Sequence, residues 1–236
     1  MIEDQHIASV FDRDLEAIQA QIMKMGGLVE AAIRDSAQSL ETRDEELAET
    51  VRKGDALIDQ LEEMINEEAA RVIALRAPIA SDLRLILSVI KISANLERIG
   101  DYAKNMAKRT GVLAQMAPVN DSSGALRRMA REVERMLNHA LDAYVQRDAE
   151  LAADVISRDR YVDQMYNALF REVLTFMMED PRNITACMHL HFIAKNIERM
   201  GDHVTSIAEQ VVYLVTGEHP EDDRPKADKT SMTAEG

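Results

Sequence analysis

The sequence predicts an all-α protein made of two tandem, sequence-related antiparallel three-helix bundles. Composition is the first observation behind this prediction: the 236 residues include only 9 Gly, 5 Pro, 4 Phe and no Trp, and they are rich in residues that favour helices over sheets. Helical periodicity is the second, because apolar residues recur every three or four positions, as at Leu15, Ile18, Ile22 and Met25. An internal repeat is the third.

The first bundle is expected within residues 1–117, and it starts with a long helix that contains a glycine pair. Gly26 and Gly27 each cost about 1 kcal/mol relative to Ala inside a helix, so we expect a bend or a close helix contact there. Asp44 is a good N-cap for the second helix, and Pro78 ends that helix because it disfavours helical geometry at the preceding residue. The three helices are expected at about residues 5–41, 44–76 and 79–115.

A linker is expected at residues 118–124, where Pro118 precedes an Asn-Asp-Ser-Ser-Gly run. The helical pattern then repeats over a second bundle, residues 125–217, which Pro181 interrupts. The helices of this bundle are expected at about residues 125–146, 148–178 and 183–216. Residues 218–236 are polar and charged and contain no aromatic residue, so we expect this tail to be disordered.

The two halves match in sequence as well as in pattern. Residues 43–48 (Arg-Asp-Glu-Glu-Leu-Ala) correspond to residues 147–152 (Arg-Asp-Ala-Glu-Leu-Ala), an offset of 104 positions. Residues 95–101 (Asn-Leu-Glu-Arg-Ile-Gly-Asp) correspond to residues 196–202 (Asn-Ile-Glu-Arg-Met-Gly-Asp), an offset of 101, so three residues are missing near Pro181. Short connections between long helices make neighbouring helices antiparallel, and each bundle is therefore expected to run up, down, up.

Acidic residues recur at matched heights in both predicted bundles. Glu97 and Asp101 lie four positions apart and share a helix face, as do Asp55 and Asp59. Residues at equal height in an antiparallel pair have a constant index sum; the pairs 59/97 and 55/101 both give 156, which centres the turn on Pro78. The corresponding pairs of the second half both give 361, which centres the turn beside its own proline. The predicted metal ligands are therefore four facing carboxylates per bundle: Asp55, Asp59, Glu97, Asp101, Asp159, Asp163, Glu198 and Asp202.

Each group of four carboxylates requires neutralisation, because clustered negative charges repel by several kcal/mol. A bound cation is the simplest full neutralisation, and oxygen ligands suit divalent or trivalent ions such as Mg²⁺, Mn²⁺ or iron, or zinc outside a Cys-rich site. A solvated acidic face without metal is the alternative interpretation, and Lys195 is another source of positive charge in the second bundle.

A purely structural helical spacer is a further possibility for the whole protein. Such a spacer would keep its fold and function after replacement of all eight carboxylates.

Charge and cysteine content exclude several classes of protein. The chain has 28 Lys and Arg against 42 Asp and Glu, a net charge of −14, so most of its surface repels nucleic acids and anionic membranes. Cys187 alone allows no internal disulfide, and the chain start lacks the basic and apolar regions of a signal peptide, so we expect a cytoplasmic location. The most apolar stretch, Leu83 to Ile92, is interrupted by Arg84 and Lys91, and no membrane span is expected.

Four stretches carry a family resemblance. They are residues 75–84 (Leu-Arg-Ala-Pro-Ile-Ala-Ser-Asp-Leu-Arg), the Glu-x-x-x-Asp motif within residues 96–101, its second copy within residues 192–203, and residues 12–27, which end in Met-Gly-Gly. Together they closely resemble the PhoU family of phosphate-uptake regulators, and the resemblance extends over about residues 5–217. The twice-repeated acidic motif with its flanking Arg and Gly is the specific part of this match.

The resemblance implies a homodimeric protein of two tandem three-helix bundles, with a multinuclear metal site on the Glu-x-x-x-Asp motif of each. It also implies a cytoplasmic, non-enzymatic adaptor that links the Pst phosphate ABC transporter, through its ATPase subunit, to the PhoR sensor histidine kinase and represses the phosphate-starvation response when phosphate is ample. Such an adaptor reaches the membrane only through protein partners. Family members carry Asn one turn after the motif Asp; Asn105 fits this pattern, whereas Ser206 takes its place in the second repeat.

A carboxylate-bridged di-iron enzyme of the ferritin type is the alternative from a different class. That enzyme needs Glu-x-x-His from two helices of one four-helix bundle. The only such spacing here runs from Glu3 to His6, at the N-terminus. Oxygen consumption by the iron-loaded protein would support this alternative, and its absence favours the adaptor.

Overall fold

The computed structural model describes residues 2–119 and 122–220, with side chains from residue 13 onward. Helices account for nearly all of this part of the chain, and no strand occurs in it, which confirms the all-α prediction. The elements are α1 (Ile2–Thr42), α2 (Glu45–Arg76), α3 (Ser81–Ala114), α4 (Ser122–Gln146), α5 (Ala149–Glu179), the 3₁₀ helix η1 (Pro181–Asn183) and α6 (Ile184–Thr216). Part of the predicted linker and most of the predicted disordered tail lie outside the described residues.

The connections α1–α2 and α4–α5 are built in the same way. Arg43 and Arg147, which correspond at the offset of 104, both adopt the left-handed conformation with φ of 56° and 57°. The next residue in each half, Asp44 or Asp148, donates its N–H to the carbonyl five residues earlier, as in a Schellman motif. The same two aspartates then cap the following helix through their carboxylates. One aspartate therefore takes part in both helix ends, and the predicted N-cap at Asp44 is confirmed.

The proline turns are where the sequence predicts them. Helix α2 ends at Arg76, and Ala77 closes it in a left-handed conformation with φ 45°. Helix α5 ends at Glu179, and Pro181 starts η1, where the carboxylate of Asp180 accepts a hydrogen bond from the N–H of Arg182.

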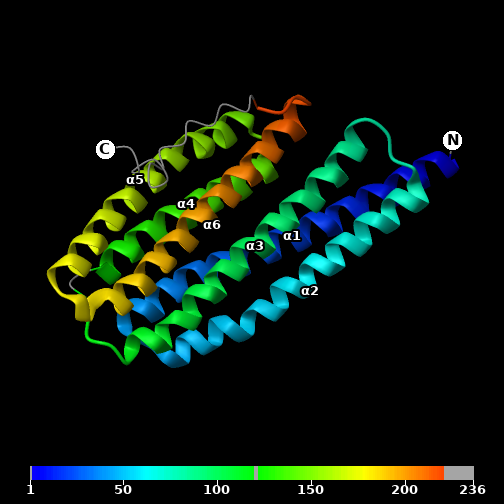
Figure 1. Cartoon of the computed structure of the whole chain (residues 1–236). Coiled ribbons are helices and arrows are strands. Elements are labelled where there is room, and N and C mark those ends of the chain that lie inside the picture. The colour runs from blue at the N-terminus through cyan, green and yellow to red at the C-terminus, as the bar shows by residue number, and fades with distance from the viewer. Residues whose placement is uncertain (1, 120–121, 221–236) are drawn as a thin grey trace.

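Each half packs against the other through corresponding helices. Helix α1 contacts α4, and α3 contacts α6, whereas α2 and α5 contact only helices of their own half and lie outside (Figure 1). Because α1 corresponds to α4 and α3 to α6, the two halves are related by an approximate twofold axis. Tyr102 and His203, which correspond at the offset of 101, meet on this axis with ring centroids 5.6 Å apart. One large hydrophobic core extends through both halves, and Ala48, Val51 and Ala107 form a small separate cluster between α2 and α3.

The predicted close helix contact at the glycine pair is confirmed. A Cβ on Gly26 would lie 2.4 Å from Cδ1 of Leu141 in α4, whereas a Cβ on Gly27 would meet open space. Gly26 therefore allows α1 and α4 to approach each other.

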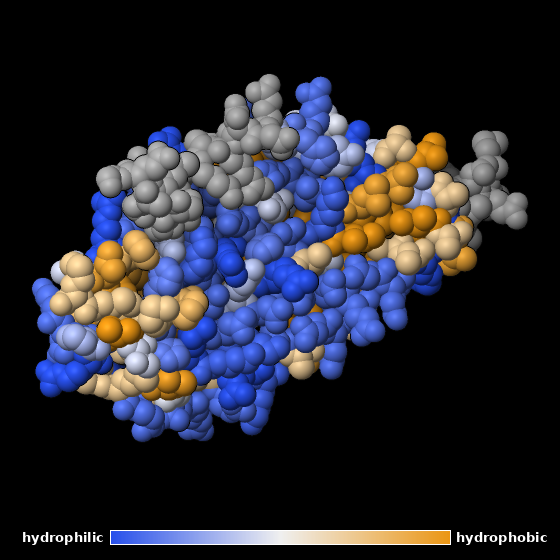
Figure 2. All heavy atoms as spheres, in the orientation of Figure 1, coloured by the Kyte–Doolittle hydropathy of each residue, from blue (hydrophilic) through white to orange (hydrophobic). Residues whose placement is uncertain are grey.

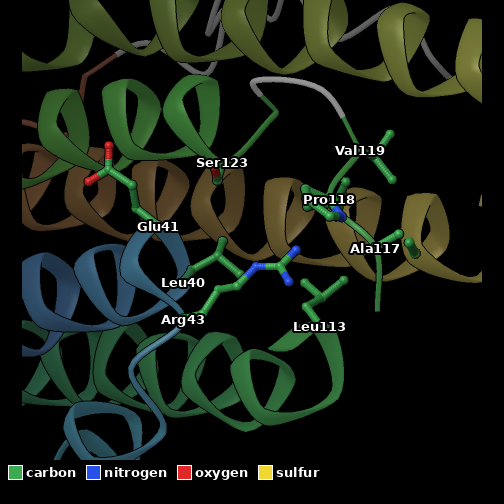
Figure 3. Close-up of a pocket in the computed structure, with 10 residues that line it drawn as sticks. Leu40, Glu41, Arg43, Leu113, Ala117, Pro118, Val119 and Ser123 are labelled. Carbon is green, nitrogen blue, oxygen red and sulfur yellow. The ribbon is translucent and has the colours of Figure 1, made fainter. Parts of the chain in front are cut away.

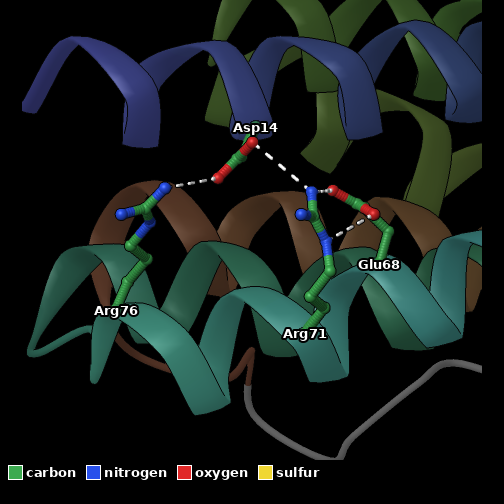
Figure 4. A network of polar contacts seen from close by, with 4 residues as sticks. All are labelled: Asp14, Glu68, Arg71 and Arg76. Atoms are coloured by element: carbon green, nitrogen blue, oxygen red, sulfur yellow. Dashed lines mark hydrogen bonds and ion pairs between the residues drawn. The ribbon is translucent and has the colours of Figure 1, made fainter. Parts of the chain in front are cut away.

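A polar network fixes the N-terminal part of α1 beside the end of α2. Asp14 lies 3.5 Å from Nη2 of Arg76 and 3.6 Å from Nη2 of Arg71, and Arg71 also pairs with Glu68 (Figure 4). The two arginines on α2 thus share one carboxylate from α1.

Apolar side chains gather toward the two ends of the molecule and are separated by hydrophilic surface (Figure 2). At the α2–α3 connection, Leu75 is 65% exposed and Ile79 is 77% exposed. At the α5–α6 connection, Met178 is 73% exposed, and Leu174 and Ile184 are exposed as well. No helix in the described part of the chain is long and apolar enough to span a membrane.

Candidate functional site

The first predicted ligand group, here called the first cluster, consists of Asp55 and Asp59 on α2 and Glu97 and Asp101 on α3. The structure brings these carboxylates together across the two helices. The pKa of Asp59 is raised, first by partial desolvation and then by the negative charges of Asp55 and Asp101. The pKa of Glu97 is raised by partial burial, by Asp101 and by Asp59. The four carboxylates thus lie near enough to influence one another electrostatically, as the register inferred from the proline turn predicts.

Glu62 is a further member of this acidic surface that sequence reasoning missed. Its charge contributes to the raised pKa of both Asp59 and Glu97. The sequence spacing could have predicted this, because Glu62 follows Asp59 by three positions and so lies on the same helix face.

The glycine of each motif faces an aspartate of the neighbouring helix. A Cβ on Gly100 would lie 3.6 Å from Oδ1 of Asp55, and a Cβ on Gly201 would lie 3.4 Å from Oδ1 of Asp159. The repeated sequence Glu-x-x-Gly-Asp thus combines two acidic side chains with a small residue that faces a third carboxylate. This position of the glycine was not recognised from the sequence.

Lys104 neutralises part of the first cluster. Its Nζ donates a hydrogen bond to Oδ2 of Asp55 and lies 3.6 Å from Oδ1 of Asp101. This hydrogen bond and the surrounding carboxylates raise the pKa of Lys104. The other oxygen of Asp55, Oδ1, is buried and has no hydrogen-bond partner among the described residues. Sequence reasoning missed Lys104, although it follows Asp101 by three positions on the same face.

The second cluster consists of Asp159 and Asp163 on α5 and Glu198 and Asp202 on α6. Asp159, Asp163 and Glu198 are all buried, with exposed fractions of 8%, 5% and 6%. The sequence singled out Lys195 as an alternative source of charge here, and its Nζ donates to Oε1 of Glu198 at 2.7 Å.

Two further residues complete the surroundings of the second cluster. Lys195 lies above the ring of Tyr166, with Nζ 5.0 Å from the ring centroid. Ser206, which stands where the first repeat has Asn105, donates its hydroxyl to the backbone carbonyl of Asp202. This hydroxyl is therefore engaged with its own helix.

Neither cluster is arranged as a finished metal site. Among the side chains that the structure describes, those of residues 13–119 and 122–220, no three Asp, Glu, His or Cys are grouped closely enough to hold a metal ion. Lysines contact both clusters instead. The donors nevertheless fit a hard cation, because they are carboxylate oxygens and one of them, Oδ1 of Asp55, is buried without a hydrogen bond among the described residues.

The histidines and the cysteine of α6 have separate surroundings. Nδ1 of His189 lies 3.0 Å from Nη1 of Arg109, whereas the His191 ring packs 5.4 Å from that of Phe170. Burial lowers the pKa of both histidines. Cys187 is a free, fully buried thiol whose pKa is raised by burial. These residues do not form a shared site.

A small cavity of about 150 Å³ lies where the end of α1 meets the segment before α4 (Figure 3). Arg43 lines it together with Leu40, Leu113 and Pro118. The guanidinium of Arg43 already donates to the carbonyl of Met116 at 2.9 Å. The cavity therefore lies where the two halves meet, and none of the cluster carboxylates lines it.

Comparison with known proteins identifies the family. The PhoU domain model matches residues 22–110 and again residues 126–211. The two matched stretches begin 104 residues apart and end 101 residues apart, the same offsets as in the internal repeat. The chain belongs to the PhoU family. Its fold of two tandem PhoU domains agrees with the resemblance carried by the acidic motifs.

Named relatives and solved structures of the PhoU family cover almost the whole chain. The "Phosphate-specific transport system accessory protein PhoU homolog" of Rhizobium meliloti is 46% identical over 233 residues, which is 96% of this chain and 95% of the relative. The protein of the same name from Caulobacter vibrioides NA1000 is 44% identical, over 97% of this chain and 99% of the relative.

The crystal structure of PhoU from Pseudomonas aeruginosa superposes with a TM-score of 0.86 at 41% identity; it covers 88% of this chain and all of that chain. The "phosphate transport system regulatory protein PhoU" of Streptococcus pneumoniae has a TM-score of 0.81 at 30% identity, covering 89% and 99%.

Proposed function

We propose that this chain is a cytoplasmic, non-enzymatic regulatory adaptor of phosphate uptake. It represses the phosphate-starvation response when phosphate is ample, by linking the ATPase subunit of a Pst phosphate ABC transporter to a PhoR-type histidine kinase. The observation that carries this proposal is its identity of 46% over 96% of the chain to a phosphate-specific transport system accessory protein. The chain acts in this proposal as a homodimer.

The exposed apolar ends support a protein that works by binding other proteins. Contiguous exposed apolar surface on a soluble domain is typical of interaction sites. The two ends lie at the α2–α3 and α5–α6 connections, which correspond in the repeat, so the adaptor has two similarly placed surfaces. Both surfaces lie outside the carboxylate clusters of the helix bodies.

Each cluster holds metal ions with carboxylate ligands in this proposal. Asp55, Asp59, Glu97 and Asp101 supply the oxygens in the first half, and the second half uses their counterparts Asp159, Asp163, Glu198 and Asp202. A bound cation would take the place that Lys104 or Lys195 occupies and would provide the charge for the remaining carboxylates. The buried Oδ1 of Asp55 supports this arrangement, since it would gain a partner.

A clean deletion in the host tests the regulatory role. Phosphate-starvation genes are expected to stay on in phosphate-rich medium, and the intact gene supplied in trans is expected to switch them off again. Normal repression in the deletion strain, with no second copy of the gene, would contradict the proposal.

Affinity capture from phosphate-replete cells tests the partners. Mass spectrometry is expected to recover the transporter ATPase and a membrane histidine kinase with the wild-type chain. A variant with two substitutions at the α2–α3 end, Leu75→Ser and Ile79→Ser, is expected to lose at least one of them, while Val112→Ser, an exposed apolar position away from that end, is expected to lose neither. Recovery of neither partner by wild type would count against the adaptor.

A further inference from the structure

The two repeats differ at the contact between α1 and α4. At one side of the approximate twofold axis, Leu141 of α4 fills the space over Gly26 of α1. The counterparts of this pair at the offset of 104 are Ala37 and Ala130. Both alanines are buried, and together they line a cavity of about 130 Å³ between the two helices. The cavity exists because a small Ala37 stands where the other repeat has a leucine.

Three arginines surround this cavity. Arg34 comes from α1, and Arg127 and Arg131 come from α4, with Glu134 as the one acidic residue among the lining side chains. The charged lining residues alone sum to about +2. Asp35 and Glu41 offset this charge through their ion pairs with Arg34 and Arg127, so Arg131 is the arginine left without a neutralising partner among the described residues.

The corresponding positions of the other repeat show that the helix contact does not require these arginines. Asn138, Met23 and Gly27 stand at the counterparts of Arg34, Arg127 and Arg131. A side chain at Gly27 would meet open space, so this side has room for an arginine and lacks one.

The partners of the arginines leave room for a ligand. Arg34 lies 3.1 Å from Asp35 and 3.8 Å from Glu134, and the Arg34 side chain is 55% exposed. Arg127 pairs with Glu41. Arg131 has no hydrogen bond or ion pair with any residue that the structure describes, and it is exposed at the rim of the cavity.

We propose that this cavity binds a small soluble oxyanion of the phosphate type. Guanidinium groups donate paired, charge-assisted hydrogen bonds that match the oxygens of phosphate. The volume suits one tetrahedral anion with its closest waters, since one water takes about 30 Å³ of liquid. Arg131 contributes a charge that no described residue neutralises, and Arg34 and Arg127 complete the cradle. The site lies between the two repeats and uses none of the eight carboxylates of the clusters.

Calorimetric titration of the full-length protein with inorganic phosphate at low ionic strength tests this site. Wild type is expected to bind one phosphate per chain, and Arg131→Ala is expected to weaken binding about tenfold. The matched control is Arg135→Ala, which removes the same charge one turn later on α4, at an exposed residue outside the cavity. It is expected to change the affinity by less than about twofold.

A second variant tests the cavity with all three arginines retained. Ala37→Leu combined with Ala130→Gly recreates the Leu141 and Gly26 pair of the other repeat, so the cavity fills without overpacking, and phosphate binding is expected to be lost. Circular dichroism melting shows whether each variant is folded.

Three results would overturn the proposal. They are no saturable binding of phosphate to wild type, an equal loss in Arg135→Ala, or retained binding in the folded double variant. Sedimentation with phosphatidylglycerol vesicles is a separate arm, in which vesicle binding that depends on Arg131 in the absence of phosphate binding would assign the arginines to a membrane surface instead.

Discussion

The two carboxylate clusters have the same acidic residues but different access to solvent. Asp59 of the first cluster is exposed, whereas its counterpart Asp163 is only 5% exposed. The side chain of Glu97 is 22% exposed, and that of Glu198 is 7% exposed. The first cluster is therefore open to solvent at Asp59 and partly open at Glu97, although Asp55 is buried, whereas the second cluster is more enclosed.

The neutralising lysines occupy different positions in the two repeats. Lys104 follows Asp101 by three positions, and its counterpart in the second half is Thr205, which is buried. Lys195 precedes Glu198 by three positions, and its counterpart is Ala94. Each acidic cluster thus has one lysine, supplied from opposite sides of the motif. The comparison indicates that the shared requirement is positive charge. A lysine supplies it in both clusters of the metal-free protein, and in the first cluster Arg98 also pairs with Glu97 and Asp101.

Removal of a motif is the change with the largest expected effect on bound metal. Glu97→Ala with Asp101→Ala removes half of the first cluster while retaining good helix formers. Metal measured by elemental analysis after dialysis is expected to fall by about half if both clusters are loaded, and nearly to zero if only the open cluster is. The matched variant, Glu198→Ala with Asp202→Ala, distinguishes these cases.

For the same variant, the direction in which the melting temperature changes, with and without metal, is a second test. The metal-free double variant is expected to melt above metal-free wild type, because two repelling carboxylates are gone. It is also expected to lose the gain that metal in the first cluster gives wild type, about 3 kcal/mol at a hundredfold excess over Kd. Dialysed wild type without metal, and melting temperatures insensitive to added metal, would show that both clusters are solvated acidic faces.

Replacing the lysine of each cluster is expected to lower the free energy of unfolding by different amounts. Lys104→Met leaves Asp55, which is only 4% exposed, without its cation, and is expected to cost about 2 kcal/mol in the metal-free protein, less than a fully buried pair because Lys104 is partly exposed. Lys195→Met is expected to cost about half as much, since Glu198 has further interactions. Urea denaturation with and without metal measures both values.

Added metal is expected to abolish the cost of Lys104→Met, because the ion takes the place of the ammonium group. An equal cost with and without metal would show that metal does not replace Lys104.

Replacing the glycine of each motif by alanine is expected to change stability by smaller amounts, which differ between the two repeats. A Cβ on Gly201 lies 3.4 Å from its nearest neighbours, an ordinary contact, whereas a Cβ on Gly100 comes to 3.0 Å from Cδ1 of Ile58. Ala in a helix is favoured over Gly by about 1 kcal/mol. We therefore expect Gly201→Ala to stabilise the protein by up to about 1 kcal/mol, and Gly100→Ala to be near neutral because Ile58 must shift. Denaturation midpoints of the two variants, measured side by side, test this difference; a larger gain for Gly100→Ala would contradict it.

Much of the fold was predictable because it depends on local and periodic signals. Pro78, Pro181 and the capping aspartates set the helix ends, and the repeat set the antiparallel register. That register was sufficient to bring Asp59 of α2 near Asp101 of α3. The sequence also identified Lys195 as a counter-charge, because it lies one turn from Glu198.

Contacts between the two halves could not be predicted, because they depend on how the bundles pack. The glycine pair predicted a close helix contact but not its partner, Leu141 of α4. That contact and the ring contact of Tyr102 with His203 join positions more than 100 residues apart. Lys104 was missed for a different reason: its contact with Asp55 requires a rotamer that reaches across α3 to α2, and sequence spacing alone does not specify it.

The smallest expected effect is the pH dependence of the first cluster. The folded-state pKa values of Asp59 and Glu97 are raised, so the metal-free native state binds protons more readily than the unfolded chain does. The free-energy cost of ionising these two carboxyl groups in the folded state is absent below their unfolded pKa values, near 4. This cost grows as the pH rises from those values to the raised folded-state values, and it is complete above them. Asp59→Asn with Glu97→Gln is therefore expected to be more stable than metal-free wild type at neutral pH, by about 0.5 kcal/mol after allowance for solvent screening, and equally stable at pH 4.

Glu63→Gln, on the exposed face of α2, is the control and is expected to show no such dependence. Saturating metal reverses the direction in which the stability of wild type changes with pH, because the ion binds the ionised carboxylates and protons then compete with it. Metal-loaded wild type should therefore lose stability as pH falls toward 4, while the double variant should not. Urea midpoints between pH 4 and 7, with and without metal, measure both slopes, and parallel slopes in the two proteins would exclude the first cluster as their origin.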